Sequence, residues 1–423
     1  MDFSTSRDYA LSLDSSDPLA EYRQKFVISD PDLIYLDGNS LGRLPKATAE
    51  RMRQVIEQEW GADLVRGWNQ DWWHAPVRIG EKIAGLVGAA PGQVIVCDSV
   101  SIDLFKLASA ALSLRPERTR IITDTLNFPS DLYILQGLVD LLGGRHVLVC
   151  IGSQGDDITP DLAALEAAID ESTALVTLSH VLFKSGYLYN IAAITELAHR
   201  KGALALWDLS HSVGAVPIEL DACNVDFAIG CTYKYLNGGP GSQAFLYVRR
   251  ELQEQVTSPI WGWWGQDSPF EFGLDYTPAP GIAHFLSGSQ GILAMLAMET
   301  SLDPILEAGM ARIRDKSVRL TEYLICLYDA LLAPLGFSLG SPRDPDLRGS
   351  HVSIRHPEGY RINRALIVEM NLIPDFRDPD NLRLGLAPLY TTFEEVWEGI
   401  NRIRQVVEEK RYEKYPSQRL TVT

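Results

Sequence analysis

Two side chains that could act together in catalysis lie where apolar runs end, between residues 203 and 241. Asp208 closes one such run, and Lys234 follows a second, just before a glycine-rich turn at residues 237–241. Taken singly, the aspartate could cap a helix, the lysine could be a solvated edge residue, and the turn could be an ordinary one. Together, a buried amine and a buried carboxylate suit an electron-sink cofactor. The amine can form a Schiff base with its aldehyde, and the carboxylate can keep its ring nitrogen protonated.

The elements that would position these side chains have the pattern of a parallel sheet. Short apolar runs alternate with amphipathic stretches, among them expected helices over 161–169 and over 191–201, the second ending at Gly202. Strands buried on both faces and separated by helices predict an α/β fold, with a mostly parallel seven-stranded sheet and helices on both faces. Ligands of such sheets bind at the carboxyl ends of the strands. The expected strands are residues 94–96, 121–122, 147–151, 174–178, 203–207, 226–229 and 244–248.

A smaller α+β C-terminal domain is expected after about residue 304. A long helix over 311–332 and a loop over 335–349 rich in Pro, Gly and Asp come first in this part of the chain. Strand, helix, strand and helix are expected next, over 351–355, 361–370, 382–386 and 393–407. We therefore expect an N-terminal segment that packs on the small domain, a large cofactor-binding domain and the small domain, at residues 1–45, 46–304 and 305–423.

The composition limits the partners and the compartment. A net charge of −17 argues against a broad surface for nucleic acid or an anionic membrane, since both need clustered Lys and Arg. Five cysteines stand without a CxxC pair, which gives no metal-ligand spacing and fits a reduced cytosol. The first residues lack a basic stretch before an apolar core, and no apolar run is long enough to span a bilayer. We expect a cytoplasmic protein that acts on a small molecule.

Several segments resemble one family of enzymes in the family's own order. The segment 35–42 is similar to an LDGNSLG signature, 127–131 to an FPSD segment and 262–265 to a GWFG segment, while 375–383 and 387–390 are similar to a DFR…LR…PLY pattern. The window around Lys234 resembles the fold-type-I pyridoxal-phosphate enzymes. The whole set, which runs from about residue 35 to 395, resembles kynureninase of the bacterial type. That resemblance implies hydrolysis of the Cβ–Cγ bond of L-kynurenine to anthranilate and L-alanine, in tryptophan catabolism.

The resemblance assigns a cofactor role to each matching position. It implies that Lys234 carries the cofactor and that Asp208 pairs with its ring nitrogen. Phe128 would stack on the ring, and Val100 and Ser101 would hold the phosphate at the start of a helix over 101–111. Core packing is the ordinary alternative for Phe128, and surface capping and a satisfied core histidine are the alternatives among the other positions. Those positions are Asp131 and Ser179 as polar contacts, His211 as a hydrogen-bonding group near Asp208, and Tyr233 as a phosphate-side tyrosine and proton donor.

The substrate side is assigned in the same way. Arg383 matches an arginine that grips the α-carboxylate, where its planar fork gives bidentate geometry, although a surface ion pair is the alternative. Asn39 and Trp68 are expected near the substrate, although packing explains a tryptophan equally well. Trp263 and Ser289 are expected across the interface of a homodimer, where they complete the neighbour's cofactor site.

Two other readings stay open from the sequence. One is another fold-type-I enzyme, such as a cysteine desulfurase or a small-substrate aminotransferase. A desulfurase needs a thiolate on a mobile loop, but the loop 335–349 has no cysteine and Cys326 lies in a helix pattern. The second is a non-enzymatic binding protein with the same fold. Such a protein would not need Lys234 or Asp208, and both residues are present here. Gln266 and Ser289 depart from the family pattern, and a lone hydroxyl at 289 predicts a preference for kynurenine over 3-hydroxykynurenine.

Overall fold

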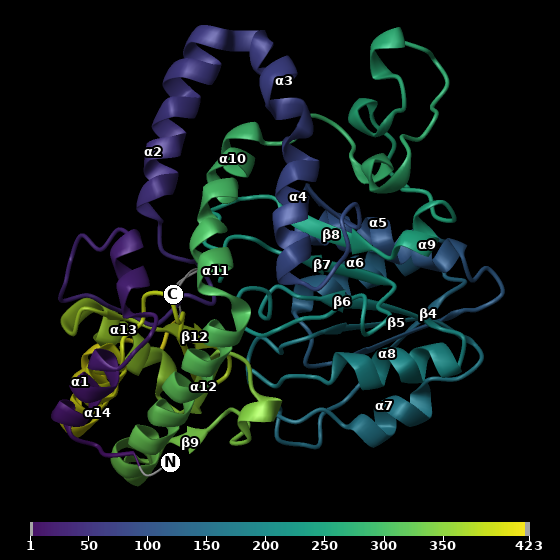
Figure 1. Cartoon of the computed structure of the whole chain (residues 1–423). Coiled ribbons are helices and arrows are strands. Elements are labelled where there is room, and N and C mark those ends of the chain that lie inside the picture. Colours follow the sequence, from purple (N-terminus) through teal and green to yellow (C-terminus); the bar gives the residue numbers. More distant parts are fainter. Residues whose placement is uncertain (1–2, 419–423) are drawn as a thin grey trace.

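The large domain is built on a seven-stranded sheet of order β2-β8-β7-β6-β5-β3-β4 (Figure 1). The computed structural model describes residues 3–418. β8 runs antiparallel to both of its neighbours, and all the other pairs are parallel. The prediction of seven strands in a mostly parallel sheet is therefore confirmed. The strands are β2 (Val94–Cys97), β3 (Arg120–Asp124), β4 (Val147–Ile151), β5 (Thr173–Ser179), β6 (Leu204–Asp208), β7 (Phe227–Gly230) and β8 (Ala244–Val248).

Helices cover both faces of this sheet, as the alternating pattern predicts. On one face α5 and α6 pack together and bury Leu104, Leu107 and Leu135 against the strands. On the other face α4, α7 and α8 close a second core. The helix expected over 191–201 is confirmed, and it ends because Gly202 takes a φ of 74°. These helices are α4 (Ala75–Leu86), α5 (Val100–Ser113), α6 (Pro129–Leu141), α7 (Leu162–Ala168) and α8 (Ile191–Arg200).

The small domain has a four-stranded antiparallel sheet of order β12-β13-β10-β9. Its two long strands and its helices confirm the predicted strand-helix-strand-helix order. Two short strands were not predicted, and the helix expected over 311–332 changes to π-helical turns at Tyr328–Leu332. The elements are α12 (Met310–Leu327), β9 (Ser338–Leu339), β10 (His351–Arg355), α13 (Gly359–Glu369), β12 (Asp375–Arg377), β13 (Asn381–Gly385) and α14 (Phe393–Glu408).

The N-terminal segment lies against the small domain. Helix α1 (Arg7–Ser15) packs on α14, and β1 (Ile34–Tyr35) pairs in parallel with β11 (Leu372–Ile373). The core of the small domain accordingly includes three side chains from this segment, Ala10, Ile34 and Leu36. The proposed domain boundaries stay a prediction.

An arm of helices rises above the sheet in Figure 1. It begins with α2 (Lys46–Gln54), and π- and 3-10-helical turns over Val55–Asp63 and Leu64–Arg66 lead to α3 (Gly67–Gln70). A second projection, the loop that follows α9 (Arg250–Gln253), lies beside it. The chain then passes through α10 (Ile292–Ser301) and α11 (Asp303–Ala308) into α12. The other 3-10 helices are Ala20–Lys25, Trp72–His74, Trp263–Gly265, Pro269–Glu271, Gly281–Phe285, Ala333–Leu335, Pro345–Leu347 and Arg411–Lys414.

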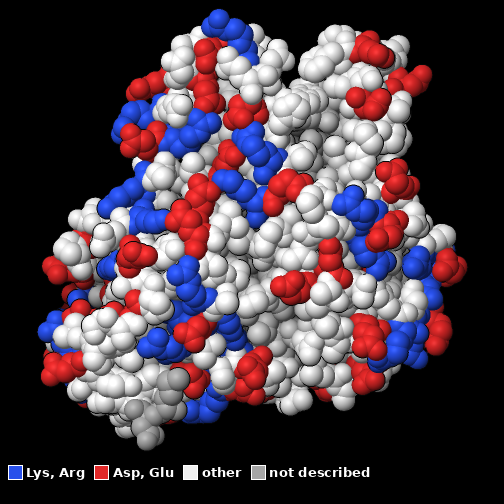
Figure 2. Space-filling view, viewed as in Figure 1, with Lys and Arg blue, Asp and Glu red and all other residues white. Residues whose placement is uncertain are grey.

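The surface agrees with the low count of basic residues. On the face shown in Figure 2, Lys and Arg are interspersed with Asp and Glu rather than gathered into one broad basic area. Among residues 3–418, none of the helices is both long and apolar enough to cross a membrane.

Candidate active site

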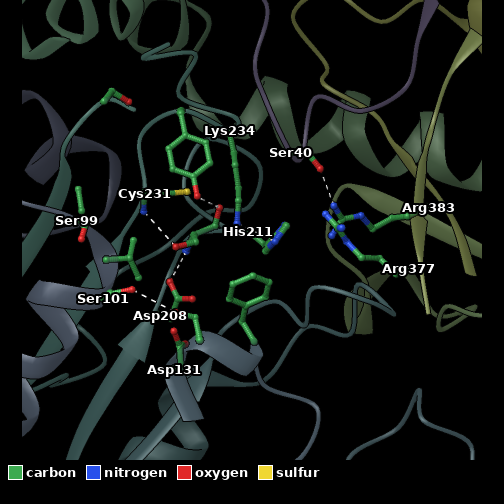
Figure 3. Close-up of a pocket in the computed structure, with 17 residues that line it drawn as sticks. Ser40, Ser99, Ser101, Asp131, Asp208, His211, Cys231, Lys234, Arg377 and Arg383 are labelled. Atoms are coloured by element: carbon green, nitrogen blue, oxygen red, sulfur yellow. Dashed lines mark hydrogen bonds between the residues drawn. The ribbon is translucent and has the colours of Figure 1, made fainter. Parts of the chain in front are cut away.

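A cavity of about 270 Å³ lies at the carboxyl edge of the large sheet and is closed on one side by the small domain (Figure 3). The ends of β2, β6 and β7 and the beginning of β8 contribute to its wall, as expected for ligand sites of parallel sheets. Its lining residues are Ser40, Ser99, Val100, Ser101, Phe128, Ser130, Asp131, Asp208, Ser210, His211, Cys231, Tyr233, Lys234, Ser242, Ala244, Arg377 and Arg383.

Lys234 and His211 form the central contact of the cavity. The Lys234 Nζ lies 2.9 Å from the His211 Nε2. Burial lowers the pKa of His211 well below its usual value, and the charges of Lys234 and Arg383 lower it further. His211 is therefore neutral at neutral pH and can accept a hydrogen bond from the lysine. The sequence-based expectation placed its contact at Asp208, but the structure gives it Lys234 instead.

Asp208 and Asp131 are two buried carboxyl groups on the same side of the cavity. Asp208 ends β6, and its Oδ1 accepts a hydrogen bond of 2.8 Å from the Ser210 N–H. Burial raises the pKa of Asp208, while Lys234 and the hydrogen bonds from Ser210 and Ser179 act against that rise. Burial and the repulsion of Asp208 raise the pKa of Asp131 well above its usual value, although Lys234 lowers it. A second positive group beside Asp208 would stabilise this pair.

One wall of the cavity is aromatic. The Phe128 side chain is 41% exposed, and Lys234 Nζ lies 6.0 Å from its ring centroid. Phe183 meets the same ring edge-on, with the centroids 5.2 Å apart. Phe128 is thus fixed as a flat apolar surface next to the lysine, and it is suited to contact a planar ring.

The beginning of α5 forms another wall. Ser99 precedes the helix, and its side chain makes no capping hydrogen bond. The N–H groups in the first turn of α5 are therefore not capped by this hydroxyl. Val100 and Ser101 line the cavity here, and the Ser101 hydroxyl lies 3.2 Å from that of Ser130. A helix N-terminus with hydroxyl groups around it can bind a phosphate without a basic patch.

Tyr233 stands beside the lysine on the cavity wall. The Cys231 thiol and burial raise the pKa of the Tyr233 phenol, so it stays protonated at neutral pH. The tyrosine can therefore donate a proton or a hydrogen bond into the cavity.

Two arginines of the small domain face the lysine side from across the cavity (Figure 3). Arg383, on β13, is buried and donates hydrogen bonds of 2.7 Å to the Phe183 carbonyl and to the Ser40 hydroxyl. It also forms an ion pair with Asp375, which lies 3.0 Å from Arg377 as well. The two arginines thus share Asp375, and the buried Asp37 carboxyl interacts electrostatically with both of them as well.

The N-terminal segment connects the two sides of the cavity. The Gly42 N–H donates a hydrogen bond of 2.8 Å to the Tyr233 carbonyl. A Cβ at Gly42 would lie only 2.3 Å from the Lys234 carbonyl oxygen, so the close approach requires glycine. Ser40, two residues earlier, contacts Arg383.

Comparison with known proteins identifies the family. Kynureninase from Pseudomonas fluorescens is 45% identical over 411 residues, which cover 96% of each chain. The chain belongs to the kynureninase family. Kynureninase from Burkholderia pseudomallei strain 1106a is 43% identical over 95% of this chain and 96% of its own, and a family model described as the kynureninase C-terminal domain matches residues 313–403.

Two solved structures of other proteins share the fold at low sequence identity. The apo cysteine desulfurase from Thermococcus onnurineus NA1 has a TM-score of 0.79 at 20% identity and covers 92% of this chain and 98% of its own. A C-DES mutant with glycine covalently linked to the PLP cofactor has a TM-score of 0.76 at 19% identity, and covers 88% of this chain and 97% of its own. The predicted fold class, that of the fold-type-I pyridoxal-phosphate enzymes, is confirmed.

The cavity fits the kynureninase cofactor, pyridoxal phosphate. It contains the amine of Lys234, the buried carboxyl groups of Asp208 and Asp131, the exposed face of Phe128 and the uncapped N-terminus of α5. The pKa values of both carboxyl groups are raised, so a positive group bound beside them would be stabilised. The structure brings together most of the predicted site residues of this kynureninase-family chain. Those that line the cavity are Val100, Ser101, Phe128, Asp131, Asp208, His211, Tyr233, Lys234 and Arg383.

The other predicted site residues do not line the cavity. Ser179 lies behind Asp208, in register with it on β5, and contacts the Asn127 side chain. Asn39 is fully buried against Gly385. Trp68 and Trp263 belong to an aromatic cluster, with centroids 5.7 Å apart, and Ser289 is exposed.

Some cavity residues were not predicted from the kynureninase motifs. Ser40 and Arg377 belong to segments that resemble the family's motifs, so the sequence around them could have pointed to both residues. His351 on β10 lies outside the cavity lining and gave no such signal, although its ring lies 5.6 Å from that of His211. The remaining unpredicted lining residues are Ser99, Ser130, Ser210, Cys231, Ser242 and Ala244.

Proposed function

We propose that this protein hydrolyses the Cβ–Cγ bond of L-kynurenine to anthranilate and L-alanine, with Lys234 as the cofactor-binding lysine. The observation that supports this most is the placement of one amine, one buried carboxyl pair and two arginines around a single cavity. The membership of the kynureninase family points to the same reaction.

Four groups of this chain would hold the cofactor. Asp208 would hold the ring-nitrogen proton, Phe128 would stack on the ring, and the first turn of α5 would bind the phosphate. Lys234 would bind the aldehyde carbon. When bound, pyridoxal phosphate supplies an aldehyde that joins amines and a protonated ring that accepts negative charge from the substrate.

Lys234 and Tyr233 would move the protons of the reaction. Lys234 would remove the proton from the substrate Cα and return one there before alanine leaves, with neutral His211 beside it to accept a hydrogen bond. Water adds to the side-chain ketone, and the bond to the aromatic acid breaks. Tyr233, which is protonated at neutral pH, can return a proton to the Cβ that becomes the methyl group of alanine.

Arg383 would bind the α-carboxylate of the substrate. Its guanidinium is oriented by Phe183 and Ser40, so its fork is already fixed before the ligand arrives. The aryl end of kynurenine would then extend toward the neighbouring subunit, where Trp68 and Trp263 pack against each other.

A cysteine desulfurase is the nearest alternative, because such an enzyme shares the fold. Cys231 lines the cavity, but burial raises the pKa of its thiol, which opposes the thiolate that a desulfurase requires. Cys326 lies on α12, and the loop 335–349 carries no cysteine. The cavity therefore favours the kynureninase reaction.

A cytoplasmic homodimer with shared active sites is also part of this proposal. Trp263 and Ser289 are exposed in the single chain and would complete the neighbour's site. Exposed apolar side chains at Trp261, Phe270 and Phe272 lie in the same projecting loop, where a second subunit would cover them. The five cysteines are unpaired, which agrees with a reduced compartment.

The assay that tests the function offers the purified holoenzyme kynurenine and cysteine separately. Fluorescent anthranilate and alanine should appear in equal amounts from kynurenine, with no sulfide from cysteine. Lys234→Ala should lose both the visible absorbance of the lysine-bound cofactor and nearly all turnover. Sulfide release without anthranilate, or full activity of Lys234→Ala, would contradict the proposal.

A further inference from the structure

A buried ion pair between Asp98 and Lys106 has no part in the reaction as described so far. Asp98 follows β2 directly, with a φ of 39°, a left-handed conformation that Asp and Asn adopt more readily than most residues. Lys106, on α5, has a fully buried side chain. Its Nζ pairs with the Asp98 carboxylate and donates a hydrogen bond of 2.6 Å to the Phe285 carbonyl. The pair thus ties the start of α5 to the segment that begins at residue 285.

Asp98 makes further contacts on both sides of Ser289. Its backbone N–H donates a hydrogen bond of 2.9 Å to the Gln290 Oε1, and the Ser287 hydroxyl lies 3.4 Å from its carboxylate. Its carbonyl accepts a hydrogen bond of 3.1 Å from the N–H of Ala244, which lines the cavity. One residue therefore contacts the wall of its own cavity and the segment that carries Ser289.

The same segment also fixes the region of Trp263. The Trp264 N–H donates a hydrogen bond of 3.1 Å to the Ser287 carbonyl. A Cβ at Gly262 would lie 2.3 Å from that carbonyl oxygen, so the two segments are in close contact. A displacement of Ser287 would therefore move both residues that are proposed to enter the neighbour's site.

Lys106 keeps its charge in this buried place. Burial alone would lower the pKa of Lys106, but Cys97, Asp103 and Asp98 raise it above its usual value. Loss of the Asp98 carboxylate would remove the nearest anion from this buried charge and leave it the Phe285 carbonyl and the Asp103 carboxylate, which lies 4.0 Å away.

We propose that Asp98 and Lys106 are positioning residues that fix segment 285–290 of one subunit for use in the active site of its partner. The inference rests on the proposed homodimer with shared sites. The inference predicts an effect between subunits, in which a change at Asp98 of one subunit weakens cofactor binding in the cavity of the other.

Hybrid dimers with two different affinity tags test this directly. In the first hybrid, one subunit carries Lys234→Ala together with Asp98→Asn, and the other is unaltered. Asn keeps the left-handed backbone and the size of the side chain while it removes the charge. Only the unaltered subunit has Lys234, so the visible absorbance of lysine-bound cofactor reports its site alone. We expect that site to bind pyridoxal phosphate about tenfold more weakly than in the hybrid with Lys234→Ala alone.

Three comparisons make the result decisive. A hybrid with Ser289→Ala in the Lys234→Ala subunit should show a similar loss. If this hybrid shows no loss of cofactor affinity, the proposal of shared active sites is wrong, and the inference that rests on it is wrong as well. If the Ser289 hybrid loses affinity and the Asp98 hybrid does not, the inference alone is overturned. In the cofactor-free Asp98→Asn protein, amide hydrogen exchange over residues 285–291 should be faster, and the pair Asp98→Asn with Lys106→Met should restore slow exchange. Unchanged exchange in Asp98→Asn would also overturn the inference.

Discussion

Asp208 and Asp131 are adjacent buried carboxyl groups with different expected roles. Asn at position 208 keeps the size and the hydrogen bond from Ser210 but cannot hold the proton of a ring nitrogen. Asp208→Asn should therefore lower kcat by roughly 100- to 1000-fold and weaken cofactor binding. Steady-state kinetics and an absorbance titration with pyridoxal phosphate measure the two effects.

Asp131→Asn is the matched control for this prediction. Because burial and Asp208 raise the pKa of Asp131 well above its usual value, this group favours its neutral form more than a solvated aspartate does. Its replacement by a neutral amide should cost much less activity than the change at Asp208. Equal losses in the two variants would mean that the charge of Asp208 has no special role.

Arg383 and Arg377 share Asp375 but differ in burial. The side chain of Arg383 is 1% exposed, whereas that of Arg377 is 35% exposed. Arg383→Lys loses the planar fork that contacts Phe183 and Ser40 and should raise KM for kynurenine about 10- to 100-fold, with a smaller change in kcat.

Arg377→Lys should raise KM by less, because solvent reaches that side chain and screens its charge. Steady-state kinetics with kynurenine compare the two variants. A larger effect at Arg377, or an unchanged KM in Arg383→Lys, would move the carboxylate site away from Arg383.

At the scale of elements, the turn after β7 is held by the N-terminal segment. A methyl group at position 42 would collide with the Lys234 carbonyl and the Asn237 side chain, both at 2.3 Å. Gly42→Ala should displace the lysine and reduce kcat/KM at least tenfold, since small misplacements of reacting groups are costly. Gly85→Ala in α4 is the control: nothing lies within 4 Å of the added methyl, so activity should stay unchanged. Equal kinetics for the two variants would contradict the role of the segment.

How far the sequence predicts the elements depends on their length and environment. Most strands of the large sheet were predictable because both of their faces are buried, which gives continuous apolar runs, and the edge strand β4 has such a run although it is partly exposed. β9 and β12 have only two and three residues, too few for any periodicity, and they exist because β10 and β13 offer partners. Non-local pairing of this kind leaves no local signal.

The same distinction applies to the site. Lys234, Asp208 and Arg383 were predictable because they occupy recognisable motifs. His351 was not, because it approaches His211 only through the packing of the small domain on the large one. The contact between His211 and Lys234 likewise depends on the fold around both residues, and residue types alone suggested Asp208 as the neighbour.

At the scale of the whole molecule, the proposed homodimer predicts that the preference between kynurenine and 3-hydroxykynurenine depends on Ser289 from the neighbouring subunit. The Gln266 side chain is engaged in its own loop, where it accepts a hydrogen bond of 2.6 Å from the Thr277 N–H. Its Nε2 also lies 3.4 Å from the Asp275 carbonyl, so both ends of the amide have partners within this loop. An unsatisfied hydroxyl costs about 1–3 kcal/mol, so kcat/KM should favour kynurenine by roughly 10- to 100-fold.

Ser289→Asn should narrow this preference, because an amide carries its donor and its acceptor on two separate atoms and extends further than a hydroxyl. Specificity constants for the two substrates, measured with both proteins, check the prediction. A clear preference of the unaltered enzyme for the hydroxylated substrate would show that Ser289 does not set the specificity.

The most direct test of the central claim is turnover of kynurenine in water enriched in oxygen-18. Hydrolysis of the Cβ–Cγ bond adds a solvent oxygen to the aromatic acid, so mass spectrometry should find labelled anthranilate and unlabelled alanine in equal amounts. The Lys234→Ala protein should form neither anthranilate nor alanine. Anthranilate without the label, or no anthranilate from a protein with its full complement of bound cofactor, would contradict the assignment of this site to hydrolytic cleavage of kynurenine.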